Sequence, residues 1–222
     1  MLNVIWDMDG VLLDSEPIYL EVEDSIASRY GKDVRTILSK LLGRTAPACA
    51  KITVDELQLP LTAEQYLDER NKLLLEKMKS VKILPGVEAI VRHLRNIGVR
   101  CAIATSSPFD LLQSKKYGKD DFFALFDALV CGDDVVNGKP DPEIFLRAAA
   151  AIDAEPSNCV VFEDAPAGCR AARLAGMKCV ALPNPHVDIG LYNAEEPQIT
   201  VPTANLLDFD ITSLGFPPMK QS

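Results

Sequence analysis

The stretch "VIWDMDGVLLDSE", residues 4–16, joins a short apolar run to three aspartates, Asp7, Asp9 and Asp14. An apolar run of this length without alternation is typical of a strand buried on both faces of a parallel sheet. In open parallel sheets, ligands bind beyond the carboxyl ends of the strands. Carboxylates that follow a buried strand directly therefore indicate a functional site at the edge of the sheet.

The rest of the chain predicts the sheet to which this strand belongs. Short apolar runs alternate with helical patterns, and this alternation is typical of a parallel sheet covered by helices. We predict an α/β fold whose buried strands lie at residues 3–6, 99–104, 128–131, 159–162 and 178–182.

Residues 16–80 break the alternation, because they contain a succession of amphipathic helical patterns without a convincing strand. Thr62 and Gln65 have the spacing of a capping box, which predicts the start of the last helix in this segment. We therefore expect an inserted helical domain at 16–80, with the core domain built from residues 1–15 and 81–222.

The composition narrows the range of partners. The 222 residues carry a net charge of -9, which disfavours nucleic acid and anionic membrane surfaces. No apolar run approaches the ~20 residues that a membrane helix needs. The six cysteines form no CxxC pair, which is typical of a reducing compartment. These observations predict a cytoplasmic protein that binds neither nucleic acid nor membranes, and we also expect a monomer.

Polar side chains follow four of the predicted strands. Carboxylates without a His or Cys cluster favour a hard metal such as Mg²⁺, and together with hydroxyls and a lysine they suit a phosphoryl group. Each residue alone is more typical of a turn or a helix cap, so the prediction depends on their convergence. The set comprises Asp7, Asp9, Thr105, Ser106, Lys139, Glu163 and Asp164.

The ordered motifs "DMDGVLLD" (7–14), "TSS" (105–107), "GKPDPEIF" (138–145) and "VFEDAPAG" (161–168) resemble the haloacid dehalogenase-like hydrolase superfamily. The resemblance implies a Rossmann-like core that a helical cap interrupts after the first strand. It also implies a Mg²⁺-dependent phosphatase, because members that cleave carbon–halogen bonds lack an acid at the position of Asp9.

The resemblance assigns roles to the strand-end residues. Asp7 would be the nucleophile, and Asp9 the general acid and base. Because Asp9 must hold a proton near neutral pH, we expect surroundings that favour its neutral form. Asp14 resembles the hinge residue of helical-cap members, and with Ser15 we expect it to cap the first cap helix. The implied ligands of Mg²⁺ are Asp7, Asp9 through its backbone carbonyl, Asp164 and Glu163, and the implied phosphate-binding residues are Thr105, Ser106 and Lys139.

Within the superfamily the chain is similar to the pseudouridine 5′-phosphatase-like subgroup, whose members hydrolyse small phosphomonoesters such as nucleotide, flavin, glycerol and sugar phosphates. Arg44 is the cap cation expected to contact the substrate. A β-phosphoglucomutase-type enzyme is an alternative, although Tyr19 stands where those mutases carry a histidine. A receiver-like signalling module is a second alternative, but a receiver has no inserted cap.

Overall fold

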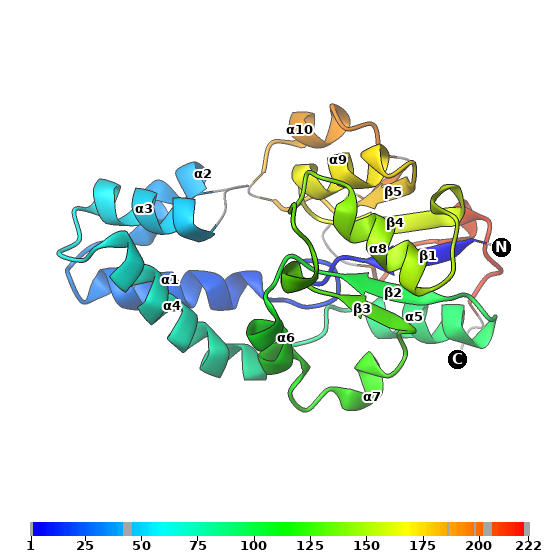
Figure 1. Cartoon of the computed structure of the whole chain (residues 1–222), viewed down its shortest axis with the longest axis horizontal. Helices are drawn as coiled ribbons and strands as arrows, with labels where there is room; N and C mark the ends of the chain where they lie inside the picture. The colour runs from blue at the N-terminus through cyan, green and yellow to red at the C-terminus, as the bar shows by residue number, and fades with distance from the viewer. Residues whose placement is uncertain (1, 42–45, 186, 198, 202–205, 220–222) are drawn as a thin grey trace.

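The sheet at the centre of the molecule is parallel throughout and has the strand order β3-β2-β1-β4-β5-β6 (Figure 1). The computed structural model describes residues 2–41, 46–185, 187–197, 199–201 and 206–219. The five expected strands are confirmed, and the two-residue β6 adds an edge strand that is too short for an apolar run to indicate it. The strands are β1 (Asn3–Trp6), β2 (Cys101–Ala104), β3 (Ala128–Val130), β4 (Cys159–Glu163), β5 (Lys178–Ala181) and β6 (Ile199–Thr200).

Helices cover both faces of this sheet, because successive side chains of a strand point to opposite faces. Val4 and Trp6 of β1 pack in one buried cluster with α5, whereas Ile5 packs in another with α8 and α9. The two layers lie on opposite sides of the sheet in Figure 1. The helices after the insertion are α5 (Val87–Asn96), α6 (Phe109–Lys116), α7 (Asp120–Phe123), α8 (Glu143–Ala151), α9 (Pro166–Leu174) and α10 (Ile189–Asn193).

All regular elements in the described residues between 16 and 80 are helical, and they form a lobe beside the sheet (Figure 1). The expected capping box is confirmed at the start of α4. There the Gln65 backbone N–H donates to Thr62 Oγ1 at 3.1 Å, and the Thr62 N–H donates to Gln65 Oε1 at 2.9 Å. The boundaries at 15/16 and 80/81 stay a prediction. The helices are α1 (Glu16–Ser28), η1 (Val34–Ile37), α2 (Leu38–Leu41), α3 (Ala46–Leu57), α4 (Ala63–Lys77) and η2 (Met78–Ser80).

The lengths and composition of the helices test the prediction that the chain has no membrane-spanning helix. Among the residues that the structure describes, none of them is both long enough and apolar enough to cross a bilayer.

Candidate active site

The ends of β1 and β4 are held in register at the middle of the sheet. The Trp6 and Phe162 rings stack with their centroids 4.2 Å apart, a pairing that contributes about 0.5–1.5 kcal/mol beyond the area it buries. The Asp7 N–H then donates to the Phe162 carbonyl at 2.9 Å. Asp7 and Glu163, the next residues along the two strands, therefore lie side by side.

Three carboxyl groups converge at these strand ends. Asp7, Glu163 and Asp164 each place one carboxylate oxygen within 4.8 Å of the others, and we call this set the acid cluster. Lys139 Nζ donates to Asp7 Oδ1 at 2.5 Å and to Glu163 Oε1 at 2.6 Å. The side chains of Asp7, Lys139 and Glu163 are only 9%, 8% and 1% exposed. The structure thus places four of the predicted site residues close together.

Two glycines allow the carboxylates to approach this closely. Gly10 has φ +72°, a conformation that side chains rarely adopt, and a Cβ there would lie 2.2 Å from Asp164 Oδ2. A Cβ at Gly168, near the start of α9, would lie 1.8 Å from Glu163 Oε1. The glycines in "DMDG" and "EDAPAG" are therefore required by the packing of the acid cluster.

The acid cluster has more negative charge than Lys139 can balance. Burial, together with repulsion by Glu163 and Asp9, raises the pKa of Asp7 from 3.8 to about 7 despite the attraction of Lys139. Burial and repulsion by Glu163 and Asp7 likewise raise the pKa of Asp164 well above its usual value. Clustered carboxylate oxygens short of positive charge are the ligands that Mg²⁺ prefers, so the residues present fit such an ion.

Asp9 lies outside the acid cluster and has its own cation. Lys115 Nζ donates to Asp9 Oδ1 at 2.5 Å and to Oδ2 at 2.7 Å, and Ser107 Oγ donates to Oδ2 at 3.0 Å. Burial raises the pKa of Asp9, but the charge and hydrogen bonds of Lys115 outweigh burial and lower it. The expectation that the surroundings of Asp9 favour its neutral form is therefore wrong for this conformation, because Lys115 stabilises the carboxylate.

The remaining predicted residues have different environments. Thr105 is buried, and its Oγ1 accepts from the Ser107 N–H at 3.1 Å, whereas Ser106 is exposed beside it. Ser15 is the N-cap of α1, but its side chain makes no capping hydrogen bond, and Asp14 lines a cavity instead. The expected capping by Ser15 is therefore wrong, and capping by Asp14 stays a prediction. Arg44 lies outside the described residues.

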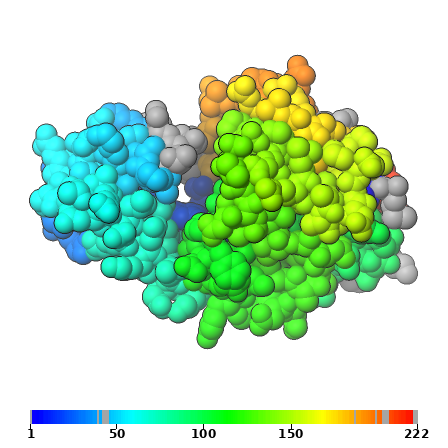
Figure 2. All heavy atoms as spheres, viewed as in Figure 1, coloured from blue at the N-terminus to red at the C-terminus, as the bar shows by residue number. Residues whose placement is uncertain are grey.

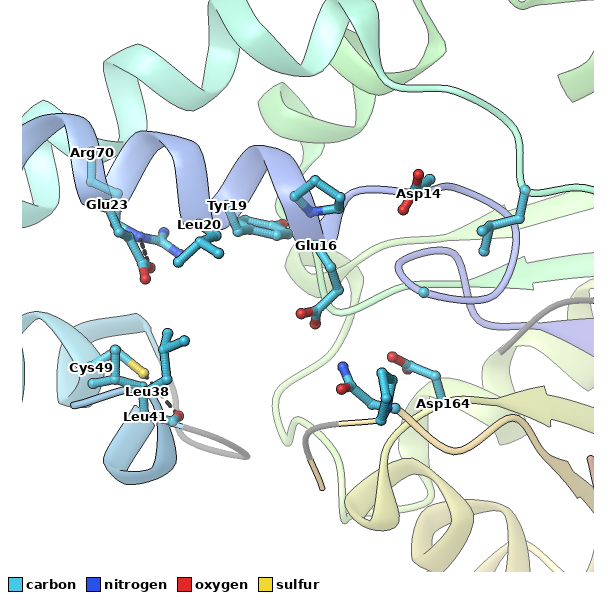
Figure 3. A pocket seen from close by; sticks show the side chains of 15 residues that line it. Asp14, Glu16, Tyr19, Leu20, Glu23, Leu38, Leu41, Cys49, Arg70 and Asp164 are labelled. Atoms are coloured by element: carbon cyan, nitrogen blue, oxygen red, sulfur yellow. Dashed lines mark hydrogen bonds and ion pairs between the residues drawn. The ribbon is translucent and has the colours of Figure 1, made fainter. Parts of the chain in front are cut away.

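A cavity of about 600 Å³ lies between the helical lobe and the sheet. Figure 2 shows the hollow between the two parts, and Figure 3 shows the side chains around it. Asp164 lies at one end, and Arg70 with Glu23 lies at the other (Figure 3). Arg70 Nε donates to Glu23 Oε1 at 3.0 Å, and the Arg70 guanidinium carbon lies 5.3 Å from the centre of the Tyr19 ring. Aliphatic walls come from Leu20, Leu38, Leu41 and Leu84.

Sequence reasoning missed Lys115 and Ser107. Lys115 lies four residues after Leu111 and three after Leu112, so it falls on the apolar stripe of α6, and its side chain is fully buried. A lysine on an apolar helical stripe indicates a buried charge that needs a partner. The sequence could have indicated Lys115 in this way, but it could not have identified Asp9 as the partner.

The fold and this geometry agree with what the comparisons find. The family model described as haloacid dehalogenase-like hydrolase matches residues 1–176. The chain therefore belongs to the haloacid dehalogenase-like hydrolase family.

Three relatives place the chain more narrowly. It is 36% identical over 221 residues to "Probable pseudouridine-5'-phosphatase" of Drosophila melanogaster, covering 97% of this chain and 94% of the relative. It is 36% identical over 228 residues to "(DL)-glycerol-3-phosphatase 2" of Arabidopsis thaliana, and the match covers 99% of this chain and 93% of the relative. A crystal structure from Thermotoga maritima named "putative beta-phosphoglucomutase" matches with 28% identity and a TM-score of 0.76. The match covers 93% of this chain and 96% of that structure. Family and named relatives together identify a phosphatase that acts on small molecules.

Proposed function

We propose that the chain is a Mg²⁺-dependent phosphatase that hydrolyses a small phosphomonoester through an aspartyl-phosphate on Asp7. The observation that carries the proposal is the acid cluster with Lys139 in its midst, at the end of the central strand and beside a cavity of about 600 Å³. A carboxylate can act as a nucleophile toward phosphorus, and an adjacent lysine can hold the phosphoryl oxygens.

The carboxylates of Asp7 and Asp164 and the backbone carbonyl of Asp9 would hold Mg²⁺, with Glu163 close to these ligands. When bound, the ion supplies positive charge to the phosphoryl oxygens. Support for this assignment comes from the raised pKa values of Asp7 and Asp164, because the single charge of Lys139 does not balance the buried carboxyl groups around it.

The chain's own residues would perform two displacements. An Asp7 carboxylate oxygen attacks phosphorus while Lys139 and Thr105, with the Ser106 backbone, hold the phosphoryl oxygens. Because Asp9 is a carboxylate in this structure, it must first take up a proton, which a phosphomonoester monoanion supplies on binding; Asp9 gives this proton to the leaving oxygen as the P–O ester bond breaks. In the second displacement Asp9 accepts a proton from the attacking water, and phosphate leaves with Asp7 restored.

We propose a nucleoside 5′-phosphate, pseudouridine 5′-phosphate in particular, as the substrate. The relative in Drosophila supports this choice. The cavity supports it too, since a ring-containing leaving group suits aliphatic walls and the Tyr19 ring better than a three-carbon alcohol does. The Arg70–Glu23 pair, whose side chains are 12% and 11% exposed, would offer a donor and an acceptor to the polar edge of a base.

A phosphosugar mutase is the second candidate, because the Thermotoga maritima structure with that name matches almost the whole chain. A mutase must protect its aspartyl-phosphate from water until a second sugar is bound. Tyr19 stands at the position of the mutase histidine, and its hydroxyl accepts from Lys115 at 3.1 Å. This difference favours hydrolysis.

Release of phosphate from p-nitrophenyl phosphate tests the proposed chemistry. The wild type should turn over only with Mg²⁺, and Asp7→Asn should lose at least ~1,000-fold in kcat, since the nucleophile is removed. Asp110→Asn, an exposed carboxylate at the start of α6, is the matched control and should keep full activity. Unchanged turnover in Asp7→Asn would contradict the assignment of the nucleophile.

A panel of phosphomonoesters tests the substrate. Pseudouridine 5′-phosphate should give a higher kcat/KM than flavin mononucleotide, glycerol phosphate or hexose phosphates. Arg70→Met should raise KM for the nucleotide about 10-fold or more, because a hydrogen bond to a charged group contributes roughly 1.5–3 kcal/mol. Arg29→Met, which breaks the exposed ion pair with Glu69, is the control. Conversion of β-glucose 1-phosphate to glucose 6-phosphate faster than release of phosphate would favour the mutase.

A further inference from the structure

Lys115 is a buried ammonium group whose hydrogen bonds join three parts of the chain. Its side chain is fully buried, and Nζ donates to Asp9, to Ser107 Oγ at 2.7 Å and to Tyr19 OH at 3.1 Å. The three acceptors come from the loop after β1, the loop after β2 and helix α1. An ammonium has three N–H donors and four oxygen atoms accept from this one, so every donor is satisfied and one of them is shared.

Burial of an ammonium group is costly unless every donor is paired, so a lysine in this position requires an explanation. Burial lowers the pKa of Lys115, but Asp9 and Tyr19 outweigh burial and raise it, which keeps the side chain charged. Structural packing alone could be achieved by Leu or Met at this point of α6. A charged donor adds what Leu or Met cannot provide, which is a contact with both oxygens of the Asp9 carboxylate.

We propose that Lys115 is a positioning residue that fixes the orientation of the Asp9 carboxylate for proton transfer. This inference rests on the proposed function. Asp9 lies in a short loop, and its side chain is 28% exposed, so its own packing does not hold the carboxylate in one orientation. Lys115 and Ser107 hold it from one side, while Tyr19 holds Lys115 from the helical lobe.

The contacts distinguish the two oxygens of Asp9. Oδ2 accepts from both Lys115 and Ser107, which occupies two lone-pair positions, whereas Oδ1 accepts from Lys115. Oδ1 is therefore the oxygen assigned to carry the proton to and from the reacting ester. Lys115 keeps its own three protons throughout and takes no part in the proton transfer, which Asp9 alone performs.

Proton donation by Asp9 matters most when the leaving group is a poor one, and this gives a specific test. An alkyl phosphate such as glycerol phosphate needs a proton on the departing oxygen, whereas p-nitrophenyl phosphate does not. We compare kcat/KM for these two substrates, because this ratio reports the steps up to formation of the aspartyl-phosphate. The variants are Lys115→Met, Lys115→Arg and, as matched control, Lys116→Met at the next position of α6.

Lys115→Met should lose about 100-fold or more in kcat/KM with glycerol phosphate and less than about 10-fold with p-nitrophenyl phosphate, since general acid catalysis contributes roughly 10²–10⁴-fold. Lys115→Arg should recover part of the loss, and Lys116→Met should match the wild type. Equal losses with both substrates would reduce Lys115 to a structural role, and wild-type rates with both would overturn the inference.

The design separates this inference from the proposed function. Failure of the wild type to hydrolyse either phosphomonoester would contradict the proposed function, whereas an active wild type with an unselective Lys115→Met contradicts only the role of Lys115. If Lys115→Met does not fold, Tyr19→Phe and Ser107→Ala take its place. Each of these variants removes one hydrogen bond that holds the Lys115–Asp9 pair. Each should lose more kcat/KM with glycerol phosphate than with p-nitrophenyl phosphate, by a smaller factor than Lys115→Met. Equal losses with the two substrates in both variants would overturn the inference.

Discussion

The metal-free protein should lose stability as the pH rises from 5 to 8, because the pKa values of Asp7 and Asp164 are both raised in the folded state. The pKa of Asp7 is raised from 3.8 to about 7 in the folded state, so the folded chain binds a proton that the unfolded chain releases. The stability from this proton is fully present below the unfolded pKa and is lost as the pH rises through the folded pKa. Integrated over this window, the loss from Asp7 alone is about 3 kcal/mol, because one pKa unit corresponds to ~1.4 kcal/mol, and Asp164 adds to the loss.

Urea unfolding followed by circular dichroism, with a chelator present, measures this loss directly. Asp7→Asn has no carboxyl group to titrate, so its free energy of unfolding should change less with pH than that of the wild type. Mg²⁺ at 100 times its Kd should restore about 2.7 kcal/mol to the wild type at pH 8. Identical pH profiles for wild type and Asp7→Asn, or a wild type that gains stability with pH, would refute the reasoning.

Three further substitutions test local contacts, two of them beside Asp164 and one at the start of α4. Gly10→Ala should abolish Mg²⁺-dependent turnover, measured as phosphate release, because its Cβ would collide with Asp164 and the φ of +72° would add roughly 1–2 kcal/mol of strain. Thr62→Ala should lower the free energy of unfolding by about 1 kcal/mol through loss of the bond from the Gln65 N–H, with kcat for p-nitrophenyl phosphate unchanged. Tyr192→Phe should lower the free energy of unfolding by about 1–3 kcal/mol in urea, because the Asp164 backbone carbonyl loses the Tyr192 hydroxyl that donates to it at 2.5 Å. An unaltered urea midpoint would contradict this expectation.

The sequence predicted the parts of the fold that depend on short-range pattern. Apolar runs indicated the five longer strands, and the residues directly after them indicated the acid cluster. Lys115 and Arg70 were not identified, because their partners Asp9 and Glu23 are distant in sequence and meet them only through the packing of helices. The protonation of Asp9 was mispredicted for the same reason, since the deciding charge comes from α6.

The position of β1 has a consequence for the order in which the molecule assembles. Val4 pairs with Cys101 on one side and with Val160 on the other, so both neighbours of β1 in the sheet come from distant parts of the sequence. Contacts between segments so distant in sequence form slowly. We therefore expect that, during refolding, enzymatic activity recovers later than helical circular dichroism, because Asp7 and Glu163 meet only when the pairing of β1 with β4 forms.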